Sequence, residues 1–141
     1  MGFSAEWYLA DKILYARNWG KTTPESVRKQ VDTLDQMLTD SAAGSIYVIL
    51  DLTQVTKALN LRDFPKAFGS YKTNPKYGWM LMVGQKDPVV RFASGVATTL
   101  FKAKQRSFNT VTEAVDFLRN VDPDIDWSTV DPSVLTRPIP A

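Results

Sequence analysis

Cysteine and histidine are both absent from the 141-residue sequence. The lack of cysteine excludes disulfides, thiol nucleophiles and thiolate metal sites, and the lack of histidine removes the commonest general base and the commonest transition-metal ligand. Histidine-dependent serine triads, zinc hydrolysis and cysteine proteolysis are therefore excluded. Catalysis would have to use aspartate, glutamate, lysine, tyrosine, serine, threonine, arginine or a bound cofactor. We accordingly predict a protein that is not an enzyme and that carries neither a metal ion nor a cofactor.

Long apolar runs and glycine-rich loops are also missing. No stretch approaches the roughly 18 apolar residues of a membrane span, and charges interrupt the N-terminal segment SAEWYLADKILYARNW, which does not resemble a secretory signal. The seven glycines are scattered and form no phosphate cradle. Asp122, Asp124 and Asp126 have the spacing that opens a calcium loop, but Trp127 replaces the required glycine and Ser133 the bidentate glutamate. These observations predict a cytoplasmic location and no calcium site.

The formal net charge of +2 conceals an asymmetry along the chain. Residues 1–56 carry a net charge of −2, residues 57–106 of +8, and residues 107–141 of −4. The cationic side chains of the middle third have two possible roles. They either lie on solvated helix faces and pair with acids elsewhere in the chain, or they bind an acidic surface of a partner. The basic cluster from Lys102 to Arg106 could contact phosphates, but lysines near a helix C-terminus also complement the helix dipole. A nucleic-acid partner is therefore not predicted. The candidate anion-binding residues are Lys66, Arg91, Lys102, Lys104 and Arg106.

Hydrophobic periodicity predicts two strands, then three helix–strand pairs and a final helix. The predicted strands are residues 6–10, 12–19, 45–52, 77–84 and 106–109. The predicted helices are residues 22–40, 64–72, 87–104 and 110–120. The first two strands form a hairpin around Ala10 and Asp11, whereas the third and fourth are apolar enough to be covered on both faces. This order predicts a single α/β domain over residues 1–121, with a mostly parallel sheet and an antiparallel first strand at one edge.

Capping residues define where the predicted helices begin. The proposed caps are Thr22, Asp63, Asp87 and Thr110. Thr22 and Glu25 have the spacing of a capping box before apolar positions at helical spacing, and Thr110 and Glu113 have the same spacing. Asp51 lies at the end of the third strand in this interpretation, and a loop of about ten residues follows, longer than such connections usually are.

The order of elements, together with SFNTVTEAVDFL at residues 107–118, resembles the STAS-like, SpoIIAA-like superfamily over about residues 5–121. Members of this superfamily end in a short strand that contributes a phenylalanine. A capped helix follows, with a glutamate, an alanine and two apolar residues near its end. The resemblance implies a mixed, mostly parallel sheet of five strands with four helices. It also implies a non-enzymatic regulatory module of a bacterial cytoplasm that binds a protein partner or a second copy of itself.

In the anti-sigma-factor antagonists of this superfamily, a serine at the start of the helix after the central strand is phosphorylated, and this decides partner binding. The corresponding residues here are Leu59, Asn60 and Leu61, which carry no hydroxyl. Thr53 and Thr56 lie nearby but precede the expected position, and threonines at strand ends commonly form turns. We therefore expect the phosphorylation switch to be missing.

Polar residues follow three of the predicted strands at the carboxyl edge of the sheet, where ligands of open α/β sheets bind. The ligand-binding candidates are Asp51, Thr53, Thr56, Gln85, Asp87 and Asn109. Capping offers a simpler explanation for Asp87, and Asp51 can accept hydrogen bonds from loop amides after its strand. Two alternatives stay open at this edge: a pocket for a small molecule or lipid, or an enzyme that uses Asp51 with a lysine or tyrosine.

Residues 122–141 form a proline-rich tail beyond the region of resemblance. Its four prolines exclude a long regular helix. Its apolar side chains are too many to leave in water. These are Trp127, Val130, Val134, Leu135 and Ile139. We predict an extended tail with at most one short turn, docked by Trp127 and Leu135 on an apolar groove of its own domain or of a second copy, in which case it is a dimer arm.

Overall fold

The computed structural model describes residues 2–57, 59–63, 66–67, 74–84 and 104–139. The strands are β1 (Gly2–Leu9), β2 (Ile13–Lys21), β3 (Ile46–Lys57), β4 (Tyr77–Val83) and β5 (Lys104–Phe108). The α-helices are α1 (Pro24–Asp40) and α4 (Val111–Val121), and the 3-10 helices are η1 (Leu61–Asp63), η2 (Trp127–Thr129) and η3 (Pro132–Thr136). The predicted helices at 64–72 and 87–104 lie largely outside the described residues. No helix in the described ranges is long and apolar enough to span a membrane.

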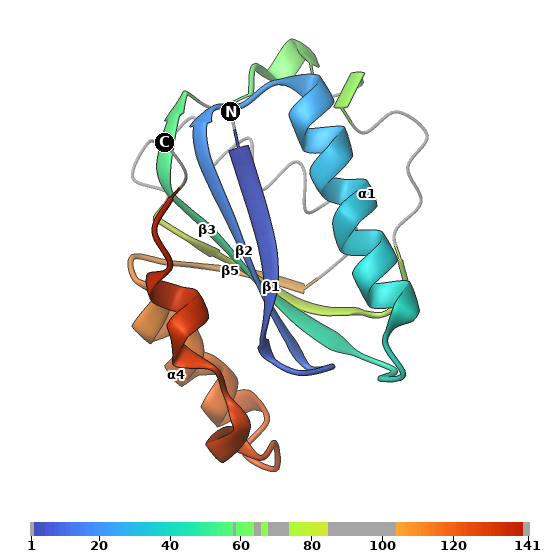
Figure 1. The fold of residues 1–141 in the computed structure, drawn as a ribbon, viewed down its shortest axis with the longest axis vertical. Helices are drawn as coiled ribbons and strands as arrows, with labels where there is room; N and C mark the ends of the chain where they lie inside the picture. The colour runs from blue at the N-terminus through green and yellow to red at the C-terminus, as the bar shows by residue number, and fades with distance from the viewer. Residues whose placement is uncertain (1, 58, 64–65, 68–73, 85–103, 140–141) are drawn as a thin grey trace.

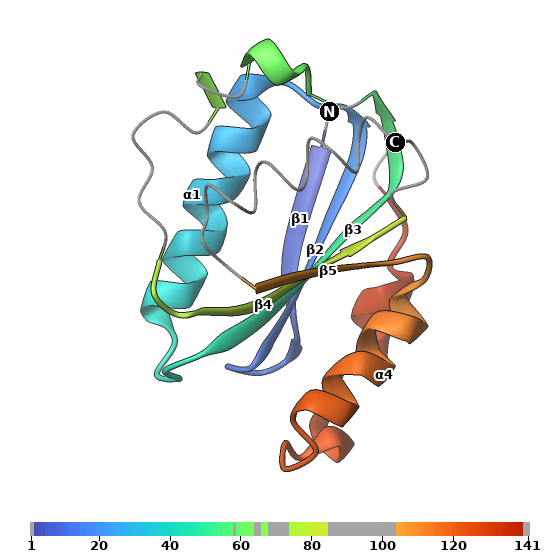
Figure 2. The same ribbon diagram turned by 180° about the vertical axis from the view of Figure 1, so that it is seen from behind.

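The five strands form one sheet in the order β1-β2-β3-β4-β5. β1 is antiparallel to β2, and all other neighbours are parallel. Helix α1 covers one face of this sheet and α4 the other, as Figures 1 and 2 show from opposite sides. The predicted mixed, mostly parallel α/β fold with an antiparallel first strand at an edge is confirmed.

The opening hairpin turns between Leu9 and Ile13. The Lys12 amide donates to the Leu9 carbonyl at 3.0 Å. Asp11 has a φ of 62°, in the left-handed region that short polar residues tolerate better than most. The Ser41 hydroxyl donates to the Asp11 carboxylate at 2.8 Å and so ties this turn to the end of α1. The predicted hairpin is present, with its turn at the predicted residues.

Helix α1 begins one residue later than predicted. Thr23, not Thr22, is the N-cap: its Oγ1 accepts from the Ser26 amide at 3.2 Å, and the Ser26 Oγ accepts from the Thr23 amide at 3.0 Å. The predicted capping box of Thr22 and Glu25 is therefore wrong, because a serine at the third helical position returns the bond that a glutamate usually makes. The Thr22 amide donates instead to the Lys57 carbonyl at 2.8 Å, at the end of β3.

Strand β3 is longer than predicted, and this changes the position of Asp51. The strand continues to Lys57, so the predicted ten-residue loop after Asp51 is wrong. Beyond Asp51 the strand pairs with β2 alone among the described strands, for example Gln54 with Trp19, because its pairing with β4 stops at Asp51. This extension is largely exposed, so the apolar pattern ends before the strand does. Asp51 lies inside a strand rather than at its end.

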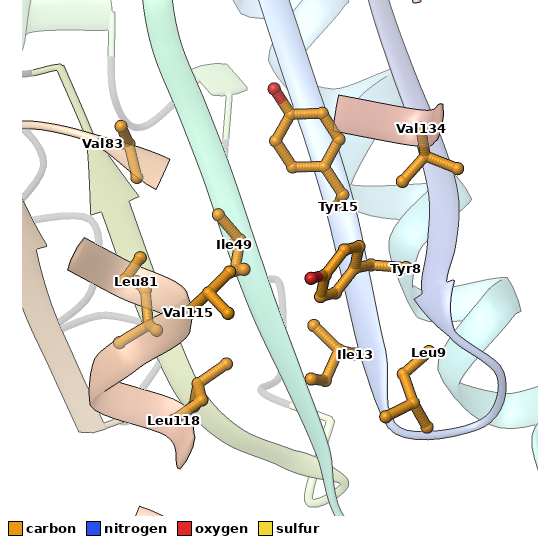
Figure 3. Packing of buried hydrophobic residues seen from close by; sticks show 11 residues of the cluster. Tyr8, Leu9, Ile13, Tyr15, Ile49, Leu81, Val83, Val115, Leu118 and Val134 are labelled. Carbon is orange, nitrogen blue, oxygen red and sulfur yellow. The ribbon is translucent and has the colours of Figure 1, made fainter. Parts of the chain in front are cut away.

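Two buried clusters hold the layers together. On the α1 face, Leu14 and Ala16 of β2 pack with residues of β3 against Leu34 and Leu38 of α1. On the α4 face, residues of β1 to β4 pack against α4 and the tail, as Figure 3 shows. The buried members of this second cluster are Tyr8, Leu9, Ile13, Tyr15, Ile49, Leu81, Val83, Ala114, Val115, Leu118 and Val134.

A buried pair of amides joins the end of β2 to α1. Asn18 Nδ2 donates to Gln30 Oε1 at 2.9 Å, and Gln30 Nε2 donates to Asn18 Oδ1 at 2.6 Å. Gln30 lies beside Val31 and Leu34 on the buried stripe of α1. Each amide satisfies the other, which removes the cost of placing them in the interior.

The tail packs against the cluster on the α4 face. It contains two short 3-10 helices, η2 and η3, where the sequence predicted at most one turn. Val134 is buried at 3% exposure, whereas Trp127 and Leu135 are partly buried against the same cluster. The Trp127 indole nitrogen donates to the Asp122 carbonyl at 3.2 Å, and the Arg119 guanidinium lies 4.8 Å from the indole ring centre.

Candidate functional site

Four polar side chains gather on the α4 face around the middle of β2 and β3. Tyr15 and Arg17 come from β2, and Asp51 and Thr53 come from β3. Alternate residues of a strand point to the same face, so these side chains continue the rows begun by Ile13 and by Ile49. Arg17 and Asp51 are register partners, and they are only 9% and 7% exposed. The site is thus a polar cluster beside an apolar core, in which Tyr15, Arg17 and Asp51 are buried and Thr53 is exposed.

The Asp51 carboxylate accepts three hydrogen bonds from this cluster. Its Oδ2 accepts from the Tyr15 hydroxyl. Its Oδ1 accepts from the Thr53 amide at 3.0 Å and from the Thr53 hydroxyl at 2.7 Å. Three of the positions at which this carboxylate can accept a hydrogen bond are therefore occupied by residues of the cluster.

Tyr15 is held as a neutral hydrogen-bond donor. Burial and the neighbouring Asp51 raise the pKa of Tyr15 to about 12, although Arg17 opposes this shift. The Arg17 Nε lies 3.4 Å from the phenol oxygen, and the guanidinium carbon lies 5.8 Å from the ring centre. The phenol therefore separates the buried cation from the buried anion and is bonded to both.

The tail closes one side of this cluster. Arg17 Nη1 donates to the main-chain carbonyl of Arg137 at 2.5 Å. The Arg137 side chain turns away to Glu6 of β1, with 2.8 Å between Nε and Oε2. Among the described residues, no carboxylate lies within 4.0 Å of the Arg17 guanidinium nitrogens. Within the described ranges, the charge of Arg17 is thus met by a phenol and a neutral carbonyl.

The structure brings together only some of the predicted ligand-binding residues. Asp51 and Thr53 are in contact, but Thr56 is exposed further along β3 and Asn109 is exposed after β5. Gln85 and Asp87 lie outside the described residues. The predicted candidates therefore supply one half of the cluster, the half on β3.

The other half, Tyr15 and Arg17, was not predicted. A signal was present: Ile13, Tyr15 and Arg17 alternate along the strand with the apolar Leu14 and Ala16, which places an arginine in line with core positions. An arginine in such a position is a candidate for a buried, hydrogen-bonded role. Its partners could not be read from the sequence, because Asp51 and Arg137 are distant along the chain.

The described anion-binding candidates are divided between the two faces of the sheet. Lys66 lies beside α1: its carbonyl accepts from Arg28 Nη2 at 2.6 Å, and its ammonium lies 3.9 Å from Asp63. An open hollow of about 590 Å³ is formed there by polar and charged residues. Its lining residues are Pro24, Glu25, Arg28, Lys29, Asp32 and Lys66. Two acids share this hollow with the cations, so it is not a uniformly positive surface.

Lys104 and Arg106 lie on the α4 side of β5. The Lys104 ammonium is 5.7 Å from the Trp79 ring centre, and the Arg106 guanidinium is 5.0 Å from the ring centre of Phe117. These contacts are cation–π interactions that partly occupy both cations. The remaining candidates, Arg91 and Lys102, lie outside the described residues.

Comparison with known proteins identifies the fold. No protein-family model and no curated protein matches the sequence. The structure is similar to that of the anti-sigma factor antagonist SpoIIAA in its unphosphorylated form, with a TM-score of 0.54 and 14% identity over 84% of this chain and 97% of that one. It is also similar to an uncharacterized DUF3478-family protein with a SpoIIAA-like fold from Shewanella loihica PV-4, with a TM-score of 0.53 and 20% identity over 83% of this chain and 92% of that one. The chain therefore has a SpoIIAA-like fold.

Proposed function

We propose that this chain is a non-enzymatic, STAS-like regulatory module that binds a protein partner or a second copy of itself. The observation that carries the proposal is the SpoIIAA-like fold, which covers 84% of the chain and nearly the whole length of an anti-sigma factor antagonist. Fold alone is a weak guide to function, so the proposal also depends on the chemistry of the candidate site.

The chemistry of the site supports binding rather than catalysis. Asp51 is the acid that the sequence offered for catalysis, and its carboxylate is engaged by Tyr15 and Thr53. Proton transfer needs a group whose pKa lies near the working pH, whereas the pKa of Tyr15 is raised to about 12. We therefore assign Asp51 a structural role, as the acceptor that fixes the Tyr15 hydroxyl and Thr53.

The segment after β3 supports a module without the usual phosphorylation switch. By the resemblance, Leu59, Asn60 and Leu61 correspond to the region where the superfamily carries its serine, and none has a hydroxyl. Leu59 is buried at 8% exposure, so an apolar anchor occupies part of this segment. Partner binding is then controlled by something other than a phosphate at this position.

Native mass spectrometry of the protein freshly purified from the cells that make it tests the proposal. We expect a complex with a second polypeptide, or a homodimer, at defined stoichiometry. A monomer that carries a stoichiometric small molecule or lipid would instead favour the ligand-binding alternative. The matched control is Asp51→Asn, which should retain the partner. A loss of binding above about tenfold, or 1.4 kcal/mol, without loss of stability would contradict the structural role of Asp51.

A further inference from the structure

Residues 131–137 of the tail are seated on β1 and β2 through three kinds of contact. The Asp131 amide donates to the main-chain carbonyl of Tyr8 at 2.7 Å. The Val134 side chain is buried in the core cluster, on the side where Figure 3 shows Tyr8 and Tyr15. The Arg137 carbonyl accepts from Arg17. A main-chain bond, a filled apolar site and a polar end contact are the features by which proteins recognise extended peptides.

The tail does not supply the ligand that Arg17 fits best. A guanidinium has five donors in a planar fork that matches the two oxygens of a carboxylate. Arg17 is nine-tenths buried, yet within the described ranges it meets only the Tyr15 phenol at 3.4 Å and one neutral carbonyl. The bond to the Arg137 carbonyl already has an ionised donor, but a carboxylate adds the opposite charge and can accept from two guanidinium nitrogens at once. A carboxylate in place of the Arg137 carbonyl would therefore bind this position more tightly.

The contacts at the end of the tail are also the kind that can be displaced. The ion pair of Arg137 with Glu6 is between side chains that are 50% and 37% exposed, and exposed pairs contribute little to stability. Asp131 and Ser133 bond mainly to each other, since both the amide and the hydroxyl of Ser133 donate to the Asp131 carboxylate. The segment thus keeps its own turn when it leaves the sheet.

We propose that the surface formed by Tyr8, Tyr15 and Arg17 is the docking site for an extended partner segment that offers an apolar side chain and, three residues later, a carboxylate. The chain's own tail occupies this surface as an internal substitute, with Val134 as the apolar side chain and the Arg137 carbonyl in place of the carboxylate. This inference rests on the proposed function, because it names the class of partner that the module binds. The tail, being tethered, competes at a high effective concentration, so the partner's carboxylate provides the advantage that displaces it.

The test uses two synthetic peptides of residues 127–137, WSTVDPSVLTR, each with an acetylated and fluorescently labelled N-terminus. One ends in a free carboxylate, which stands where the tail places the Arg137 carbonyl, and the other ends in a carboxamide. The receptor is the full chain carrying Val134→Asp, which removes the buried anchor and frees the surface. Val134→Ala serves as a milder second receptor if Val134→Asp does not unfold cooperatively.

Fluorescence anisotropy should show that the acid peptide binds the released chain about tenfold more tightly than the amide peptide. The unmodified chain should bind the acid peptide at least about tenfold more weakly than the released chain does. Adding Arg17→Gln to the released chain should abolish the preference for the acid. Equal affinities for acid and amide, a preference that survives Arg17→Gln, or no binding to either released chain would overturn the inference. A partner polypeptide still found by native mass spectrometry would then leave the proposed function standing and exclude only this surface.

Discussion

Tyr15, Arg17 and Asp51 form a sequence of hydrogen bonds that resolves a conflict between burial and charge. A buried cation and a buried anion each lose their hydrogen bonds to water. Here the phenol of Tyr15 lies between them and replaces some of those bonds. Direct pairing of register partners across two strands would have been the simpler arrangement. The phenol stands between the Arg17 guanidinium and the Asp51 carboxylate, so other N–H donors of Arg17 are left to bond to the tail. The residue that determines this geometry is therefore Tyr15 rather than either charged group.

Titration of Tyr15 should be delayed to high pH. Its pKa is raised to about 12 from the ordinary 10.0, first by burial and then by Asp51. Because the folded-state pKa lies above the unfolded one, this group stabilises the fold fully below about pH 10, and the stabilisation is lost as the pH rises through 12. The late-titrating fraction of the tyrosinate absorbance should therefore become smaller in Tyr15→Phe, and the part due to Tyr47 should remain.

The control for this titration is Asp51→Asn, which removes the charge but keeps the side-chain volume. It should lower the pKa of Tyr15 only in part, because burial, the largest cause of the shift, remains. Tyr47 provides an internal reference, since its pKa is also raised to about 12, by burial and by the hydrogen bond to Asp122. A Tyr15→Phe protein that loses a transition near pH 10 instead would contradict the arrangement of the cluster.

At the scale of elements, the N-terminus of α1 offers a direct test of which threonine caps it. Thr23→Ala removes the bond from the Ser26 amide and should cost about 1 kcal/mol of unfolding free energy. The matched control is Thr22→Ala, because the Thr22 side chain does not cap the helix. The Thr22 amide donates to the Lys57 carbonyl, and alanine keeps that amide. Urea denaturation of both variants gives the comparison. A larger loss for Thr22→Ala would restore the capping box that the sequence first indicated.

The elements themselves were predicted from the sequence where apolar periodicity was strong and mispredicted where it was weak. Strand β3 was expected to end at Leu52, because the residues that follow are polar and exposed. A different signal was available there: Thr53, Val55 and Thr56 are β-branched, and such side chains favour extended backbone even when no core covers them. Polarity indicated exposure correctly, but exposure is compatible with an extended strand as well as with a loop.

At the scale of the whole molecule, the order of elements was sufficient to predict the sheet but not the site. Parallel neighbours joined by right-handed crossovers leave few arrangements for this order, and the observed sheet follows the chain from β1 to β5. The polar cluster instead joins residues as far apart as Arg17 and Arg137. No local pattern links such positions, since their contact depends on the path of a tail that has no regular periodicity.

Removal of the tail tests whether residues 122–141 belong to the fold of their own chain. Deletion would uncover the core at Val134, break the bond between Asp131 and Tyr8, and leave Arg17 without the Arg137 carbonyl. Losing the burial of one valine alone costs about 2 kcal/mol, so the melting temperature should fall by roughly 5–10 °C. Sedimentation should show an unchanged mass state, because all these contacts lie within one chain. Deletion of residues 140–141 alone is the control and should leave the melting temperature unchanged, since every described tail contact remains. Conversion of a dimer to a monomer would show that the tail is exchanged between copies, and an unchanged melting temperature in the long deletion would show that the tail does not stabilise the fold.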